Sequence, residues 1–334
     1  MGIHALYDRS SQTRGLDPEG GKMTTLAKQG GEGWQPSAAS FAEAMPQIWG
    51  AWGVSSEVGL LRAVLLRRPG PEVDAVVDHN AALWLEPMDP DLARSQHDAL
   101  AEAYRANGVT VHYVKNGRLD KPNSHFVRDL MLMTPEGAIV ARPASQQRAG
   151  EERFVAEALG RLGVPVLMTV HGEGTFEGAD VALAGPELAF LAEGQRTNSA
   201  GADQVEWALR QVGFRQVVRV RLRPPYLTVH LDGVLSLVDR DLAFMHPRRT
   251  PAEAVNALRD HGFRILEVPS EDRHMPSNGV ALAPGRLVVP AGNPRAKQLL
   301  EEAGCTIVEV DIRELQNSGG GIHCMTGFLK RDDP

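Results

Sequence analysis

The feature that most constrains the fold is a pattern of predicted secondary structure that recurs along the chain. From residue 126 onward, two short apolar strands, a helix and another strand follow one another at intervals of roughly 45–55 residues. Internal repeats of this length are typical of propellers and solenoids. The predicted helices cover Glu151–Leu162, Ala200–Val212, Pro251–His261 and Pro294–Ala303.

The two ends of the chain suit the two parts of one further unit. A strand over 60–70, a helix over 90–107 and a strand over 109–114 lack a partner strand that the segment 321–329 would supply. We therefore predict an α/β fold, a five-bladed α/β propeller of strand-strand-helix-strand pseudo-repeats. A doubly wound Rossmann sheet is the weaker alternative, because no G-x-G-x-x-G motif follows a strand and paired strands indicate antiparallel hairpins.

The chain divides into two parts by composition. Residues 1–44 are rich in Gly, Ser, Gln and Lys and have no apolar periodicity, so we predict a flexible N-terminal tail. Residues 45–334 are predicted to form a single propeller domain.

Charge and cysteine content narrow the ligands and the compartment. The net charge of −7 argues against nucleic acid, whose phosphates require a concentrated basic face, and it favours a cationic small molecule. The chain has only two cysteines and no apolar run of about 18 residues, so we expect a reducing, cytoplasmic location and no membrane segment. The sequence leaves open whether the chain forms a homo-oligomer.

Polar residues stand where the first strand of each predicted unit begins. In a ring these strand starts would converge on the central axis, which would bring distant parts of the sequence into one site. The residues are Arg128, Asp129, Glu177, Asp180, His230, Asp232, Asn278, His323 and Cys324.

Cys324 is the candidate nucleophile. It follows three consecutive glycines and His323 in the run NSGGGIHCMT, and such glycines are most simply explained by the close approach of a substrate or a loop. A nearby imidazolium or a cationic substrate could lower the pKa of its thiol. The alternative is a small buried core residue, an interpretation that we give instead to Cys305.

His230 is the candidate acid–base partner. In a strand, His230 and Asp232 would point to the same face, with Leu231 opposite, and could act together beside a bound cation. A half-buried structural histidine and a zinc ligand are the alternatives. No C-x-x-C or H-E-x-x-H spacing supports zinc.

A set of acidic residues is suited to a guanidinium ligand. Asp129, Glu177 and Asp180 stand at the starts of apolar strands, where an unpaired carboxylate is costly. A guanidinium offers several coplanar N–H donors and pairs well with two carboxylates. Taken singly, the same residues could be caps and turn formers. Arg196, just before a helix, is a candidate for binding a substrate carboxylate, and Arg148 is a weaker one.

These motifs together resemble the guanidine-modifying superfamily of arginine deiminases, arginine dihydrolases, dimethylarginine dimethylaminohydrolases and amidinotransferases. PNSHFVRD, FEGAD, RTN, HLDGVLSLVD and GGGIHCMT occur in the superfamily's order between Ser55 and Cys324. Two departures leave the substrate and the second nucleophile open. Gly178-Ala179 replaces the commoner double glycine, and GGGIHCMT looks more like agmatine deiminases and amidinotransferases than like the dimethylarginine enzymes.

The resemblance implies a five-bladed propeller, a covalent thiouronium intermediate on Cys324, and neither a metal nor an organic cofactor. It implies that His230 protonates the departing amine and then activates water, with Glu177 supporting the imidazole. It also implies that Asp129 and Asp232 hold the guanidinium. The remaining substrate-binding candidates are Arg196 for the carboxylate, and Asp180, Asn123, Asn278 and Arg148.

Three functional hypotheses follow. The first is hydrolysis of arginine or an N-substituted arginine to citrulline or ornithine. The second is transfer of the amidino group to an acceptor amine, which shares the first half-reaction. The third is a non-catalytic propeller that binds a cation or a protein partner.

Overall fold

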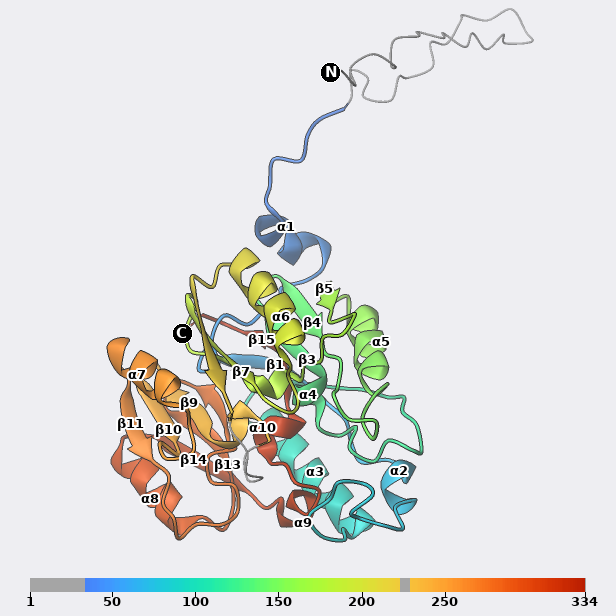
Figure 1. Ribbon diagram of the computed structural model, residues 1–334, viewed down its shortest axis with the longest axis vertical. Coiled ribbons are helices and arrows are strands. Elements are labelled where there is room, and N and C mark those ends of the chain that lie inside the picture. The colour runs from blue at the N-terminus through green and yellow to red at the C-terminus, as the bar shows by residue number, and fades with distance from the viewer. Residues whose placement is uncertain (1–33, 223–228, 334) are drawn as a thin grey trace, which may run out of the picture. The chain divides into compact units, whose positions relative to one another are not determined.

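Figure 1 shows the computed structural model, which describes residues 34–222 and 229–333. From Phe41 to its C-terminal end the chain forms one compact unit. The tail predicted over residues 1–44 lies largely outside the described residues, and helix α1 (Phe41–Ile48) begins within its last part. Each helix in the described ranges is too short or too polar to span a bilayer.

Five three-stranded sheets contain the named strands of the described residues. In each sheet the middle strand pairs antiparallel with one neighbour and parallel with the other. The middle strands are apolar and mostly buried, as expected for strands covered on both faces. In sheet order the strands are β15 (Gly327–Arg331), β1 (Leu61–Leu66) and β2 (Thr110–Tyr113); β3 (Met131–Thr134), β4 (Gly137–Val140) and β5 (Val166–Thr169); β6 (Val181–Leu183), β7 (Leu188–Glu193) and β8 (Gln216–Arg221); β9 (Leu235–Asp239), β10 (Leu242–Met245) and β11 (Arg264–Glu267); β12 (Val280–Ala283), β13 (Arg286–Pro290) and β14 (Thr306–Val310).

One helix in each unit connects the middle strand to the strand parallel with it, as a parallel crossover requires. Each of these helices was predicted to within one residue at either end. The first of them begins at a local signal, because the Asp89 carboxylate accepts hydrogen bonds from the N–H groups of Asp91 and Leu92. The five helices are α3 (Pro90–Ala106), α5 (Glu152–Leu162), α6 (Ser199–Gln211), α7 (Ala252–Asp260) and α8 (Pro294–Glu302).

The C-terminal strand returns to the first sheet, which confirms the expectation for the segment 321–329. Val64 of β1 lies opposite Phe328 of β15 in an antiparallel pair. Contacts between neighbouring sheets also link all five in a cycle. Strand β15 contacts β3, β6 contacts β9, β9 contacts β12 and β12 contacts β1, while β3 contacts the turn η1 (Gly178–Asp180) that precedes β6.

Short helical turns stand where the sequence analysis expected polar strand starts. Asp129 lies in α4 (Val127–Leu130), Asp232 in η2 (Leu231–Gly233) and Cys324 in α10 (Ile322–Met325). The expectation that His230 and Asp232 share one face of a strand was wrong, because His230 precedes a turn in which Asp232 lies. A helical turn rises about 1.5–2 Å per residue against about 3.3 Å in a strand, so it gathers polar side chains at the strand end.

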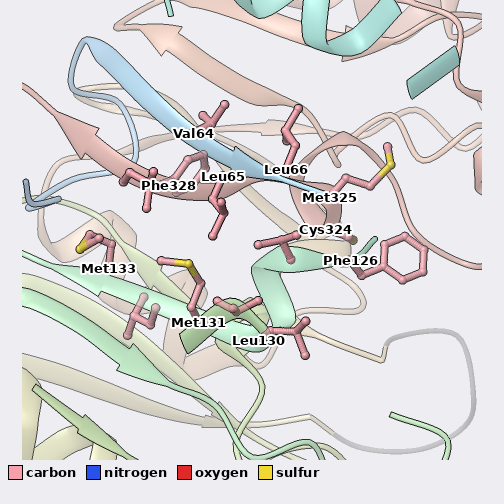
Figure 2. Packing of buried hydrophobic residues seen from close by; sticks show 14 of the residues in the cluster. Val64, Leu65, Leu66, Phe126, Leu130, Met131, Met133, Cys324, Met325 and Phe328 are labelled. Carbon is pink, nitrogen blue, oxygen red and sulfur yellow. The ribbon is translucent and has the colours of Figure 1, made fainter. Parts of the chain in front are cut away.

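Hydrophobic packing fixes the backbone around Cys324. Ile322 and Met325 of α10 are fully buried in a cluster that also includes β1, β3 and β15 residues. Figure 2 shows Cys324 beside Phe126 and Met325 at one side of this cluster. Cys305 is buried in a second cluster, as predicted. Two further short helices, α2 (Pro71–Asp74) and α9 (Arg313–Gln316), complete the described helical content.

Candidate active site

The glycines before Cys324 are required by close packing of neighbouring side chains. Gly319 has a φ of +95°, which residues with a Cβ rarely adopt. A Cβ on Gly321 would lie 2.5 Å from Oδ1 of Asn278, and one on Gly320 would overlap the ring of Phe126. The run therefore allows side chains from two other units to reach the backbone of α10.

The thiol of Cys324 contacts polar groups from two neighbouring units. Nδ2 of Asn278 donates to Sγ at 3.3 Å, and the thiol donates to Oδ2 of Asp232 at 3.4 Å. Burial raises the pKa of the Cys324 thiol well above its ordinary value, and the carboxylates of Asp232 and Asp129 raise it further. The thiol is therefore neutral at neutral pH unless a cation is bound beside it.

His230 is held between carboxylates. Its Nε2 donates to Oε2 of Glu177 at 2.6 Å, and its Nδ1 lies 3.8 Å from Oδ1 of Asp129. Burial alone would lower the pKa of His230, but Asp129, Glu177 and Asp180 raise it to about 10. The imidazole is consequently protonated at neutral pH and can donate a proton.

Glu177 remains ionised although it is buried. Burial opposes ionisation, but the hydrogen bond from His230 and the charges of Arg148 and Arg196 lower the pKa of Glu177 to about 2. Asp129 has one engaged and one free oxygen. Arg148 donates to Oδ2, while Oδ1 is buried without a hydrogen-bond partner in the described part of the chain.

The two candidate arginines differ in how far they are already engaged. Arg148 is 4% exposed and pairs with Asp129 and Glu151, whose Oε2 lies 2.9 Å from the guanidinium. The side chain of Arg196 is 19% exposed and lies 3.4 Å from Oε1 of Glu177. Arg196 therefore has more hydrogen-bonding capacity left for a ligand than Arg148.

Asp180 and Asn123 are bound mainly to the protein itself. Oδ2 of Asp180 accepts from the hydroxyl of Thr197 at 2.6 Å, and Oδ1 accepts from the N–H of Leu231 at 3.3 Å. These bonds engage both oxygens of Asp180 and fix the backbone next to His230, and a role for Asp180 in substrate binding stays a prediction. Asn123 accepts from Nε1 of Trp84 at 2.8 Å and also faces a cavity.

Two cavities meet at the thiol. Val229, His230, Gly319 and Cys324 line both of them. The smaller, of about 120 Å³, also has Asn123, Phe126, Asp129, Arg148 and Arg196 in its wall. The larger, of about 670 Å³, includes Asp232, Asn278, His246, Glu267 and Arg273. Nine of the candidates thus line a cavity or contact a residue that does, and Asp180 lies behind them.

A metal-binding geometry also occurs within this set. Asp129, Glu177 and His230 each offer one ligand atom, and these atoms lie within 4.8 Å of one another. Two of these groups are already joined by the His230–Glu177 hydrogen bond, and Arg148 pairs with the third. The expectation of a metal-free site stays a prediction.

Two buried charged residues around the site, Glu151 and Glu57, were not identified from the sequence. Glu151 pairs with Arg148, and Glu57 pairs with Arg128 at 2.7 Å and with His323 at 3.2 Å. Glu151 lies three residues from Arg148, so its spacing could have suggested the pair. Glu57 precedes β1 in the same way that the other polar residues precede their strands, which is the signal that could have identified it.

Comparison with known proteins assigns the family. The model of the family described as N,N dimethylarginine dimethylhydrolase, eukaryotic, matches residues 86–330. The chain belongs to this dimethylarginine dimethylhydrolase family. The guanidine-modifying superfamily that its motifs predicted is thereby confirmed.

Known dimethylarginine dimethylaminohydrolases match this chain over most of its length. The N(G),N(G)-dimethylarginine dimethylaminohydrolase of Streptomyces coelicolor is 32% identical over 270 residues, which cover 80% of this chain and 97% of that one. A structure of the Pseudomonas aeruginosa enzyme complexed with citrulline has a TM-score of 0.69 at 26% identity, over 81% of this chain and 100% of that chain. An amidinotransferase from Microseira wollei shares the fold, with a TM-score of 0.71 at 16% identity over 85% of this chain and 98% of that chain.

Proposed function

We propose that the protein is a cysteine-dependent hydrolase of the guanidino group of arginine or an N-substituted arginine. The observation that carries the proposal is a buried imidazolium, His230, that lines the same cavities as the thiol of Cys324. Family membership supports it, as does the set of carboxylates that face those cavities.

Substrate recognition would use the charges that the protein leaves available. The free oxygen of Asp129 and the carboxylate of Asp232 are suited to the guanidinium, which offers paired N–H donors. Arg196, the less engaged arginine of the small cavity, is suited to the α-carboxylate of the substrate.

The proposed chemistry begins when the substrate cation lowers the pKa of the Cys324 thiol, which loses its proton to solvent. The thiolate attacks the guanidinium carbon and forms a C–S bond. One C–N bond then breaks, and the leaving amine takes the proton of His230. Neutral His230 next removes a proton from water, which attacks the thiouronium carbon and releases a ureido product and the thiol. Glu177 stabilises the imidazolium in the first step.

We also propose that the cycle of five sheets is a five-bladed α/β propeller. The pairing of β15 with β1 and the contacts among the first strands support this arrangement. In it, α4, η1, η2 and α10 would surround the axis and carry Asp129, Asp180, Asp232 and Cys324 to one end of the ring.

Direct assay of candidate substrates tests the proposed activity. The protein would be incubated with arginine and with mono- and dimethylated arginines, and citrulline, ornithine, ammonia and methylamines would be measured. We expect a ureido product and a matching amine from at least one of them. Absence of turnover with all of them would refute the proposal.

The larger cavity makes amidino transfer the second candidate. Its volume of about 670 Å³ exceeds the space that a departing ammonia or dimethylamine needs, and it opens on Cys324 and His230. An acceptor amine could therefore reach the thiouronium carbon from this side. Transfer requires release of ornithine that depends on an added amine. Ornithine release that is independent of every amine offered would exclude it.

The pH dependence of Cys324 alkylation should show that the substrate assists ionisation. In the Cys305→Ala background without ligand, we expect the midpoint of alkylation above the ordinary thiol pKa, because burial, Asp232 and Asp129 disfavour the thiolate. A non-reactive guanidine that leaves Sγ accessible should move the midpoint to lower pH, since its positive charge stabilises the thiolate. A midpoint below the ordinary range without ligand would indicate a standing thiolate–imidazolium pair instead.

Three further statements stay predictions of this proposal. They are a cytoplasmic location, the absence of any cofactor and a small-molecule guanidine as the partner. Addition of a chelator in the substrate assay tests the second, because a metal-free enzyme should retain its full rate.

A further inference from the structure

A chain of buried side chains leads from the first strand to the thiol. Oε2 of Glu57 lies 3.2 Å from Nε2 of His323, and Nδ1 of His323 lies 2.9 Å from Oδ2 of Asp232. The same Oδ2 accepts from Sγ of Cys324 at 3.4 Å. We refer to these three residues as the Glu57–His323–Asp232 chain.

The surroundings hold His323 in one position. Its backbone N–H donates to Oδ1 of Asn278 at 2.9 Å, and its ring packs edge-to-face against Phe328 with centroids 5.3 Å apart. Glu57 is fixed on its far side by Arg128, which donates to Oε1 at 2.7 Å. Neither end of the imidazole can therefore rotate away from its carboxylate without breaking other contacts.

The hydrogen bonds of His323 require one protonation state of its ring. Both ring nitrogens of His323 face carboxylate oxygens, and only the imidazolium carries a hydrogen on both nitrogens. The pKa values agree with this. Burial opposes the charge, yet Glu57 and Asp232 raise the pKa of His323, and the imidazolium in turn helps to keep the pKa of Asp232 below its usual value although burial opposes it. The charged or titratable groups next to the Glu57–His323–Asp232 chain are Arg128, Arg331, His230, Asp129 and Cys324.

We propose that His323 is a positioning residue whose imidazolium, locked between Glu57 and Asp232, keeps Asp232 ionised and directed at Sγ of Cys324. This inference rests on the proposed function, in which Asp232 binds the guanidinium. His323 itself does not transfer the proton to the leaving amine, because both its nitrogens are occupied and it lines neither cavity, whereas His230 lines both.

The Glu57–His323–Asp232 chain also connects the site to the pairing of the first and last strands. Glu57 precedes β1, His323 precedes β15, and these two strands form the antiparallel pair that joins the ends of the chain. The charge that stabilises Asp232 is therefore supplied only when that pair has formed.

The first test follows the pH dependence of ligand binding and turnover. His323→Asn can keep one neutral N–H donor but loses the charge and the bond to Glu57. Without the imidazolium the pKa of buried Asp232 should rise, so the acid limb of kcat/KM and of binding a non-reactive guanidine should move up by about 1–3 pH units. The control is His97→Asn. It alters a fully buried histidine that does not belong to the Glu57–His323–Asp232 chain, and it should leave the acid limb in place.

The second variant alters Glu57, at the outer end of the Glu57–His323–Asp232 chain. Glu57→Gln removes the outer charge, so His323 should lose its proton at a lower pH than in the parent protein. Asp232 titrates at a pH where His323 is still protonated, so the acid limb of ligand binding should stay in place in Glu57→Gln, while His323 itself titrates at a lower pH than in the parent. If His323→Asn only scales the profiles without moving the acid limb, His323 has a structural role and the proposal is overturned.

A spectroscopic measurement separates this proposal from the proposed function. In ligand-free parent protein with ¹⁵N-labelled histidine, the signals absent from His323→Asn should show both ring nitrogens protonated well above the ordinary pKa of 6.5. Titration of His323 at or below 6.5 would overturn the proposal, whether or not the variants fold. A persistent imidazolium in a protein that neither binds nor converts any guanidine would refute the proposed function alone.

Discussion

Replacement of Cys324 by alanine is expected to abolish turnover while the protein remains folded. The thiol forms the C–S bond of the proposed intermediate, and no other cysteine is near enough to substitute, because Cys305 is buried in the second hydrophobic cluster. Loss of the nucleophile in a cysteine- or serine-type mechanism leaves only binding and electrostatic effects, so kcat should fall by more than about 10³-fold. The measurement is product release from the best substrate, with circular dichroism melting to verify the fold.

Cys305→Ala is the matched control for this prediction. It removes a buried thiol of the same type from the other cluster, so it should lower stability slightly and leave kcat near that of the parent. Activity that survives in Cys324→Ala but disappears in Cys305→Ala would mean that the nucleophile has been misassigned. A non-catalytic binding module would have no activity to lose in either variant, and it would retain its ligand affinity in Cys324→Ser.

Asp129→Asn is expected to weaken substrate capture strongly. The substitution removes the charge of a carboxylate whose free oxygen is buried beside His230. Truncating one partner of a desolvated charge pair costs about 2–5 kcal/mol, which corresponds to a dissociation constant raised by about 30- to 5,000-fold. Calorimetric titration of a non-reactive guanidine measures the change directly.

Two further variants separate ligand binding from fold stability. Asp129→Asn also disturbs the pair with Arg148, so its unfolding free energy must be measured in parallel. Asp232→Asn removes the second carboxylate proposed to hold the guanidinium, and it should weaken binding by a similar factor. Asp203→Asn alters an exposed carboxylate paired with Arg219 and should leave affinity unchanged. Parent-like affinity in both Asp129→Asn and Asp232→Asn would show that these carboxylates are structural.

The order of the elements could be predicted from sequence because each long helix carries its own signals. Apolar periodicity and flanking turn residues located α3 and α5 to within one residue. The return of the C-terminal segment to β1 also followed from counting strands in the repeat. The turns that carry Asp129 and Asp232 could not be predicted, since three or four residues are too few to show a helical or strand period.

The composition of the candidate site was predictable, but its internal connections were not. Polar residues that interrupt apolar strand starts suggested His230 and the acidic set, because such residues are costly to bury without partners, and the glycine run before it suggested Cys324. The contact between Glu57 and His323 depends on the pairing of β15 with β1, and the two residues lie 266 positions apart. Sequence spacing holds no record of that contact.

Asp180 shows that residue type and sequence position do not reveal whether a buried carboxylate is free to bind a ligand. Its position before an apolar strand suggested a ligand, as for Asp129. The structure instead gives both its oxygens to Thr197 and to the backbone of Leu231. Residue type and position were equal in the two cases, and only the neighbours supplied by other units separate a free carboxylate from an engaged one.

The central claim is that Cys324 carries the substrate covalently, and the mass of the trapped protein tests it most directly. The protein would be mixed with arginine or with N,N-dimethylarginine, in which both methyl groups are on one nitrogen, quenched in acid within the first turnovers and digested for peptide mapping. Hydrolysis predicts that both substrates leave one adduct on Cys324, with the mass of arginine minus ammonia, because the amine departs before water attacks. Amidino transfer predicts an adduct of the amidino group alone. A peptide containing Cys324 that remains unmodified while products accumulate, or an adduct on Cys305, would contradict the account.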